Sequence, residues 1–315
     1  MKGEKIMKKA HGAILMLVSF VVCLLAGCGS AGSGNSASQI KMGSLTAVNL
    51  TSEEFSASLR NRSYALQLTA GQGGAAFEYS DDFRDRLEGA EISAVYYDTL
   101  SAMQMALQTG EIEAFAISKT VADYLCVRND AFDNAVPVTK EGDRADPFLV
   151  SYSMMLTAEN EPLRDEIEQA IADMKSDGTL NRLSSDQIYG LTKDTEPAAA
   201  SFTPVDGGET IRVAVTGDLP PMDYITADGT PAGFNTALLA ELGTRLGKNI
   251  ELVSVDAGAR ASALAAGVVD VVFWARTVTQ EGGEADELSR LDVPEGTILT
   301  EPYFTDMAAI VFAAD

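Results

Sequence analysis

Apolar and polar positions along the chain form two patterns: short apolar runs typical of strands, and an amphipathic periodicity typical of helices. The same order of elements occurs twice. The first copy predicts strands at 64–69, 92–97 and 111–117, with helices at 77–87 and 100–107. The second copy predicts strands at 211–215, 250–255 and 267–273, with helices at 234–246 and 260–265. Strands joined by helices run parallel, so the pattern predicts an α/β protein with two similar halves.

Ligands of such sheets bind outside the carboxyl ends of the strands. The loops that follow the predicted strands are therefore the places where function is expected, and two halves facing each other across these loops would enclose a cleft. One of the loops contains Gly71, Gln72 and Gly73. Their backbone N–H groups at a helix start suit an anion site, and a simple tight turn is the alternative.

The beginning of the chain has the pattern of an export signal. Four lysines precede an apolar run at 13–25, which is shorter than the ~20 residues that a helix needs to cross a membrane. The small residues before Cys28 resemble the lipobox of bacterial lipoproteins, which implies cleavage after residue 27 and acylation of Cys28. Residues 28–38 are small and polar, as in a flexible tether. An ordinary secretory signal with a chance cysteine is the alternative.

Removing residues 1–27 changes the chemistry that remains. The one histidine, His11, and one of the three cysteines leave with the signal, and Cys28 would carry lipid, so Cys126 is left alone. Triads that need histidine and zinc sites that contain it are thereby excluded, as is an internal disulfide. We expect no metal, no cofactor and no enzymatic activity.

The net charge of the chain is −23. Without the four lysines and one glutamate of the signal, 19 basic and 45 acidic residues remain, a net charge of −26. Such a surface repels phosphate backbones, so a nucleic-acid partner is not expected. The acidic balance by itself names no ligand.

Several motifs of the second copy resemble the first lobe of the solute-binding proteins of amino-acid ABC transporters, family 3. The residues that carry this resemblance are 218–224, 228–229, 233–235, 260–264, 277–281 and 301–304. The first half resembles the second lobe of that family through 106–112 and 121–125, and its closing helix through 162–180. The resemblance implies the two-lobed periplasmic-binding-protein fold of type II and a monomer that delivers a small solute to an ABC permease.

The lobes stand in the reverse of the usual order of that family. We therefore predict a circular permutation: a second-lobe-like domain at 39–155, a closing helical segment at 156–196, a linker at 197–208 and a first-lobe-like domain at 209–315. Segments near Ser151 and Thr305 would cross between the lobes. The tail of one copy followed by the head of another, from a truncated tandem, is the alternative.

Loop positions and the resemblance together give the candidate ligand-binding residues. Each of several has a plainer alternative: core packing for Met222 and Trp274, a lobe interface for Tyr224, a helix N-cap for Asn235, and a solvated side chain for Arg260. An arginine fork suits a carboxylate because it donates two parallel hydrogen bonds. The full set is Gly71, Gln72, Gly73, Ser118, Asp218, Met222, Tyr224, Asn235, Arg260, Trp274, Arg276 and Thr277.

Two positions depart from the family. Gly282 stands where relatives commonly hold the ligand carboxylate with an arginine, and Ser118 stands where they hold its ammonium with an aspartate. Arg260 or Arg276 could replace the first anchor, so an anionic or zwitterionic solute, amino-acid-like or a simple carboxylate, is expected. A binding lipoprotein or sensor without a transporter, and a carboxylate-based enzyme on the same scaffold, are the alternative functions.

Overall fold

The computed structural model describes residues 39–45, 67–70, 77–78, 91–138, 149–195, 197–277 and 294–314. The predicted signal, Cys28 and the tether lie outside these residues. So do Gly71, Gln72, Gly73 and Gly282.

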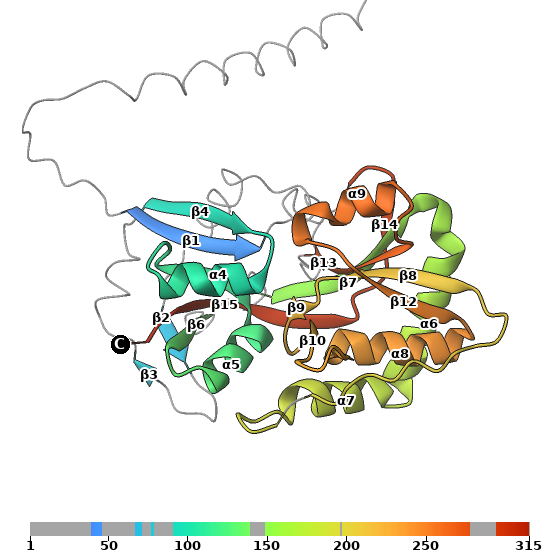
Figure 1. Cartoon of the computed structure of the whole chain (residues 1–315), viewed down its shortest axis with the longest axis horizontal. Helices are drawn as coiled ribbons and strands as arrows, with labels where there is room; N and C mark the ends of the chain where they lie inside the picture. Colours follow the sequence, from blue (N-terminus) through green and yellow to red (C-terminus); the bar gives the residue numbers. More distant parts are fainter. Residues whose placement is uncertain are drawn as a thin grey trace, which may run out of the picture. The chain divides into compact units, whose positions relative to one another are not determined.

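The N-terminal half contains three parallel strands, β1 (Gln39–Leu45), β4 (Glu91–Tyr97) and β5 (Ala114–Ser118). They lie in the order β4-β1-β5. The helices α4 (Leu100–Gln108) and α5 (Lys119–Arg128) follow β4 and β5 along the chain, and Figure 1 shows both helices in this half. In the sheet, the first of these strands along the chain, β1, thus lies between the second, β4, and the third, β5.

The C-terminal half repeats this arrangement. Its parallel strands are β8 (Thr210–Val215), β12 (Asn249–Ser254) and β13 (Val271–Thr277), in the order β12-β8-β13. The helices α8 (Phe234–Leu246) and α9 (Arg260–Ala265) begin and end where the sequence predicts. The prediction of an α/β fold with two similar halves is therefore confirmed.

The start of α8 shows how the sequence sets a boundary. Gly233 is its N-cap, with φ +105°, and a Cβ built there would lie 2.5 Å from the carbonyl oxygen of Met222. Only glycine meets both conditions. The helix ends at Gly247, which adopts the left-handed conformation at φ 63° that commonly terminates helices. The apolar face of α8 is buried and includes Phe234, Leu238 and Leu242.

Two long strands join the halves. They are β7 (Leu149–Thr157) and β15 (Phe304–Ala313), which contain the segments expected to cross (Figure 1). The first part of β15 pairs with β7, and the rest pairs with β5. β7 in turn pairs with β13 of the C-terminal half. One continuous path of paired strands therefore connects the two parallel groups.

The remaining elements lie around these sheets. The helical segment α6 (Glu161–Ser176), α7 (Thr179–Ser184) and the π-helix η3 (Ser185–Tyr189) packs against α8. A small antiparallel sheet follows β8, formed by β9 (Asp218–Leu219), β10 (Asp223–Ile225) and β11 (Pro231–Ala232). The other short elements are β2 (Gln67–Ala70), β3 (Phe77–Glu78), β6 (Phe132–Val138), β14 (Thr297–Leu299), η2 (Ala158–Asn160) and η4 (Ala257–Ala259).

Two predictions for the first copy are wrong. β2 begins at Gln67 and pairs antiparallel with β3 and β6, so it is not the first parallel strand of the half. That strand is β1, which no prediction included. The predicted helix at 77–87 is a strand at Phe77–Glu78, because these residues pair with β2, and 79–87 lie outside the described residues.

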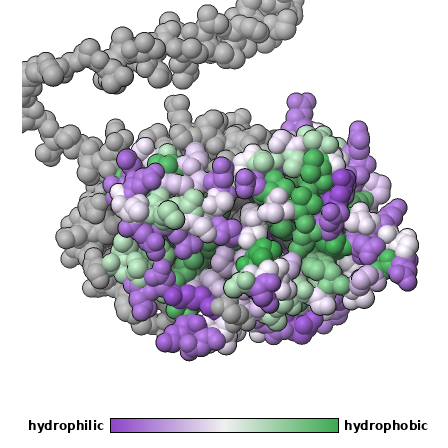
Figure 2. Space-filling view, in the orientation of Figure 1, coloured by the Kyte–Doolittle hydropathy of each residue, from purple (hydrophilic) through white to green (hydrophobic). Residues whose placement is uncertain are grey.

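A large core cluster draws residues from both halves, including Leu100 of α4 and Leu219 of β9. Hydrophilic side chains cover much of the face in Figure 2, and hydrophobic ones gather on the half that carries β8 and β12. In the described part of the chain, no helix is both long enough and apolar enough to cross a membrane.

Candidate functional site

Trp274 stands at a distortion of β13, near the carboxyl end of the strand. The register of β13 with β7 shifts between Val272 and Ala275, and Trp274 has φ 64°. A bulky non-glycine residue in this conformation is strained by about 1–3 kcal/mol, and such strain clusters at functional sites. The indole ring stacks on Tyr152 of β7, with ring centroids 3.7 Å apart and planes inclined by 20°. The ring is thus held in a fixed orientation and is partly exposed.

Arg260 fixes the backbone of this residue. Its Nη1 donates to the carbonyl oxygen of Trp274 at 3.0 Å, and its Nε donates to that of Ala257 at 3.0 Å. Only 7% of Arg260 is exposed, so the solvated alternative does not describe it. A buried guanidinium interacts more strongly with an anion than an exposed one, because little water screens it. The structure therefore brings two of the predicted ligand residues together.

Tyr303 lies against the same aromatic group. Its ring centroid is 4.8 Å from that of Phe273, and burial, with the charge of Asp223 second, raises the pKa of Tyr303 well above its ordinary value. The side chain therefore stays neutral. Neither Tyr303 nor Tyr152 is predicted as a ligand residue from the sequence, although Tyr303 lies in the family-like motif at 301–304.

Asn235 serves a buried carboxylate. Its Nδ2 donates to Asp223 Oδ2 at 2.8 Å, and Asp223 Oδ1 accepts from the backbone N–H groups of Thr216 and Gly217 at 2.9 and 3.0 Å. Burial raises the pKa of Asp223, although these hydrogen bonds act in the opposite direction. The N-cap alternative for Asn235 is wrong, because Gly233 is the N-cap and Asn235 is the second residue of α8.

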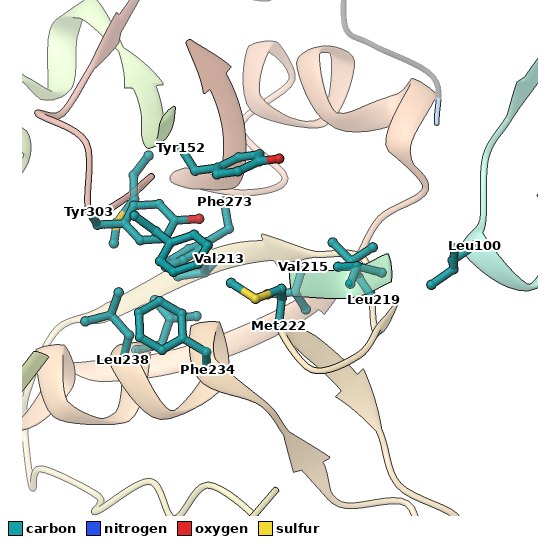
Figure 3. Close-up of a cluster of buried hydrophobic side chains, with 14 of the residues drawn as sticks. Leu100, Tyr152, Val213, Val215, Leu219, Met222, Phe234, Leu238, Phe273 and Tyr303 are labelled. Atoms are coloured by element: carbon teal, nitrogen blue, oxygen red, sulfur yellow. The ribbon is translucent and has the colours of Figure 1, made fainter. Parts of the chain in front are cut away.

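Met222 packs in the core, as its plainer alternative predicts. It is fully buried, and Figure 3 shows it between Val215, Leu219 and Phe234. Tyr224 is half-buried on β10 and pairs with Asp218 and Ala232. The loop that contains Pro220, Pro221 and Met222, called the Pro-Pro loop below, thus turns its methionine into the C-terminal half.

Asp218 reaches the N-terminal half. Its Oδ2 accepts from the backbone N–H of Ser101 at 2.9 Å, and its Oδ1 accepts from the hydroxyl of Ser101 at 2.7 Å. Ser101 lies in the first turn of α4, so the carboxylate occupies the positive end of that helix. The loops after β4 and β8 therefore meet, as the two-half arrangement predicts.

Ser118 marks the end of β5 and the N-cap position of α5. It is 3% exposed, and its hydroxyl has no partner among the described residues. The backbone N–H of Thr120 donates instead to Asp306 Oδ2 of β15, at 2.8 Å.

Arg276 and Thr277 lie on β13 opposite Tyr152 and Ser151 of β7. The sequence predicts them after a strand that ends at 273, whereas β13 extends to Thr277 and includes both.

A cavity of about 320 Å³ opens between α5, the segment after η3 and the Pro-Pro loop. Its lining includes Thr120, Tyr124, Tyr189 and Pro221. Arg128, also in the lining, lies over the ring of Tyr124, with the guanidinium carbon 4.5 Å from the ring centroid. None of the described ligand candidates lines this cavity. Two lining residues are their chain neighbours: Lys119 directly follows Ser118, and Pro221 directly precedes Met222.

Residues 211–290 match the model of a protein family, the bacterial extracellular solute-binding proteins, family 3. This segment contains most of the second-copy motifs that resemble that family, so the resemblance of this part of the chain is confirmed. The match covers about a quarter of the chain. It does not reach the first half.

Solved structures of binding proteins are also similar to the chain. The protein AgaA of A. tumefaciens R10, in complex with agropinic acid, is 12% identical with a TM-score of 0.38, over 72% of this chain and 56% of that one. A ligand-binding component of an ABC-type import system from Staphylococcus aureus, with zinc bound, is 11% identical with a TM-score of 0.41, over 87% of this chain and 66% of that one.

A structure of OxyR is similar to the chain as well. Full-length OxyR from Pseudomonas aeruginosa is 10% identical with a TM-score of 0.34, over 99% of this chain and 69% of that one. The chain thus spans little more than half the length of AgaA and about two thirds of the other two structures. No curated protein matches it.

Proposed function

We propose that this chain is an extracytoplasmic solute-binding protein that captures a small polar solute between its two α/β halves. One observation carries the proposal: the buried Arg260 holds the strained Trp274 at the carboxyl end of β13, where ligands of such sheets bind. The family matched by residues 211–290 is one of extracellular solute-binding proteins, which supports the same function.

The finer parts of the proposal rest on the sequence. The chain is anchored to the bacterial cell membrane through lipid on Cys28 and delivers its solute, as a monomer, to an ABC permease. Its lobes are circularly permuted, with the seam at 197–208. The repeated strand order, second-first-third in each half, supports two similar lobes.

The solute is anionic or zwitterionic. Arg260 supplies a cation in a site of low exposure, while Ser118 offers a hydroxyl where relatives carry an aspartate. A carboxylate buried without a partner is costly, and a guanidinium recovers much of that cost. Trp274, stacked on Tyr152, provides the apolar wall.

A thermal-shift screen tests the proposal. Protein from residue 29 onward, which keeps the compact unit Ser38–Asp315, is heated with amino acids, small carboxylates and small amines. A solute that binds only the folded form raises the melting temperature. A carboxylate-bearing compound is expected to give the largest shift, and the Arg260→Ala variant is expected to lose it. If only simple amines stabilise the protein, and do so equally in the unmodified protein and in Arg260→Ala, the proposed site is contradicted.

A further inference from the structure

The contact between Asp218 and Ser101 is the polar link described above between β9 of the C-terminal half and α4 of the N-terminal half. Both oxygens of the carboxylate are used, one by the backbone N–H and one by the hydroxyl of the same serine. The hydroxyl and the N–H of Ser101 converge on this carboxylate from the first turn of a nine-residue helix. Thr99 caps the same helix by accepting from Ala102, so each of these groups has its own acceptor.

An apolar contact lies beside the polar one. Leu100 is 1% exposed, and so is Leu219, which follows Asp218 on β9. The two leucines belong to the same core cluster although they come from different halves, and Figure 3 shows Leu100 on a separate ribbon facing Leu219. Leu100 and Ser101 are neighbours along the chain, and so are Asp218 and Leu219. The polar and the apolar contact therefore form and break together.

We propose that Asp218 and Ser101 are positioning residues that latch the two halves together around the solute. This inference rests on the proposed function, because a latch matters only where two halves enclose a ligand. In this structure the carboxylate of Asp218 is already occupied by α4, so Asp218 acts on the solute through the closure of the halves. Its predicted role as a direct ligand contact is replaced by this one.

The size of the effect follows from the geometry. A carboxylate at a partly exposed helix N-terminus stabilises its contact enough to change an equilibrium about fivefold. Losing it should therefore shift the balance of closed and open molecules toward open by about that factor. Asp218→Asn keeps one acceptor oxygen but no charge, so its shift is expected to be smaller than that of Asp218→Ala.

Electron–electron distance measurements test the latch without any solute. Spin labels are placed at Met105→Cys on α4 and Val268→Cys in the C-terminal half, two side chains that are 65% and 50% exposed. Cys126 is replaced by serine, and the protein begins at residue 29. Asp218→Ala and Ser101→Ala are each expected to move part of the distance distribution to longer values. Ser101→Ala removes only the hydrogen bond of the hydroxyl, because the backbone N–H of residue 101 remains, so its shift should be the smaller one. The double variant should match Asp218→Ala, which removes both hydrogen bonds.

Two controls separate a latch from a general loss of structure. Ser101→Thr keeps both donors and should restore the original distribution. Asp206→Ala removes an exposed carboxylate from a turn of the same half and should change nothing. Circular dichroism confirms that each variant is folded. An unchanged distribution in both alanine variants, or shifts that add in the double variant, would overturn the latch whatever the outcome of the solute screen.

Discussion

Arg260 and Trp274 depend on each other at the scale of single residues. The carbonyl that Arg260 holds belongs to a residue with φ 64°, a conformation that tryptophan does not adopt without support from its surroundings. Removing the guanidinium takes away both the expected partner of a solute carboxylate and the support of the aromatic wall.

Arg260→Ala is therefore expected to weaken solute binding at least tenfold, which corresponds to about 1.4 kcal/mol. Trp274 is the one tryptophan of the chain, so its fluorescence reports binding directly. Titration of the best solute from the thermal screen gives the two dissociation constants. Arg260→Lys keeps the positive charge but not the planar guanidinium that donates two parallel hydrogen bonds, so it should recover only part of the lost affinity. Equal affinity in all three proteins would place the solute elsewhere.

Asp223 is expected to matter for stability. It is 1% exposed and accepts hydrogen bonds from Thr216, Gly217 and Asn235. Asp223→Ala leaves these donors buried without an acceptor, and the free energy of unfolding should fall by about 3–5 kcal/mol. Urea unfolding followed by circular dichroism measures the change. Asp228→Ala, which removes an exposed carboxylate five residues along the chain, should cost far less.

Elements with strong local signals could be predicted from the sequence, and those that depend on distant partners could not. α8 lies between Gly233 and Gly247, and both of its ends match the prediction. β1 has seven residues and directly follows the segment that the sequence predicts to be a tether, so the pattern predicts the first strand of the first copy at 64–69 instead. Only the pairing of β1 with β4 and β5 reveals it as the first strand.

The junction between α6, α7 and α8 gives a prediction about pH. Asp177 accepts from the N–H of Thr179 and from Arg245 of α8, each at about 2.8–2.9 Å. These hydrogen bonds, the one from Thr179 first, lower the pKa of Asp177 to about 2. Because the folded pKa lies below the unfolded value, the stability that Asp177 contributes is present above pH ~4 and is lost as the pH falls toward 2.

Asp177→Asn keeps the acceptor for Thr179 and removes the charge that Arg245 pairs with. The variant should melt below the unmodified protein at pH 6, and the gap should close between pH ~4 and ~2. Melting temperatures measured across this range check it. Asp186→Asn, at an exposed pair with Arg182, serves as the control, with little gap at any pH. A gap at Asp177 that persists at pH 2 would mean that the amide, not the charge, is responsible.

At the scale of the whole molecule, the candidate site could be predicted in part. The sequence located Trp274 because it lies near the end of a predicted strand, and Arg260 because of the resemblance to the family. It did not reveal that they touch, since their contact depends on the bulge in β13, nor that Tyr152 from a distant strand stacks on the indole. It also could not separate Met222, which packs in the core, from Asp218, which bridges the halves, because both stand in one loop.

The net charge leads to a last prediction, about the rate of binding. From residue 29 onward the chain has 19 basic and 45 acidic residues, a net charge of −26, so a diffusing anion meets a repulsive field before it reaches the buried Arg260. Salt screens the long-range field far more than the contact within the site, since the Debye length falls from about 30 Å at ~0.01 M to about 3 Å at ~1 M. The association rate of an anionic solute should therefore rise severalfold over this range of sodium chloride, while its dissociation rate changes little. Stopped-flow fluorescence of Trp274 measures both rates. A rate that falls with salt would show that the solute is a cation drawn in by the acidic surface, and Arg260 would then have no solute carboxylate to bind.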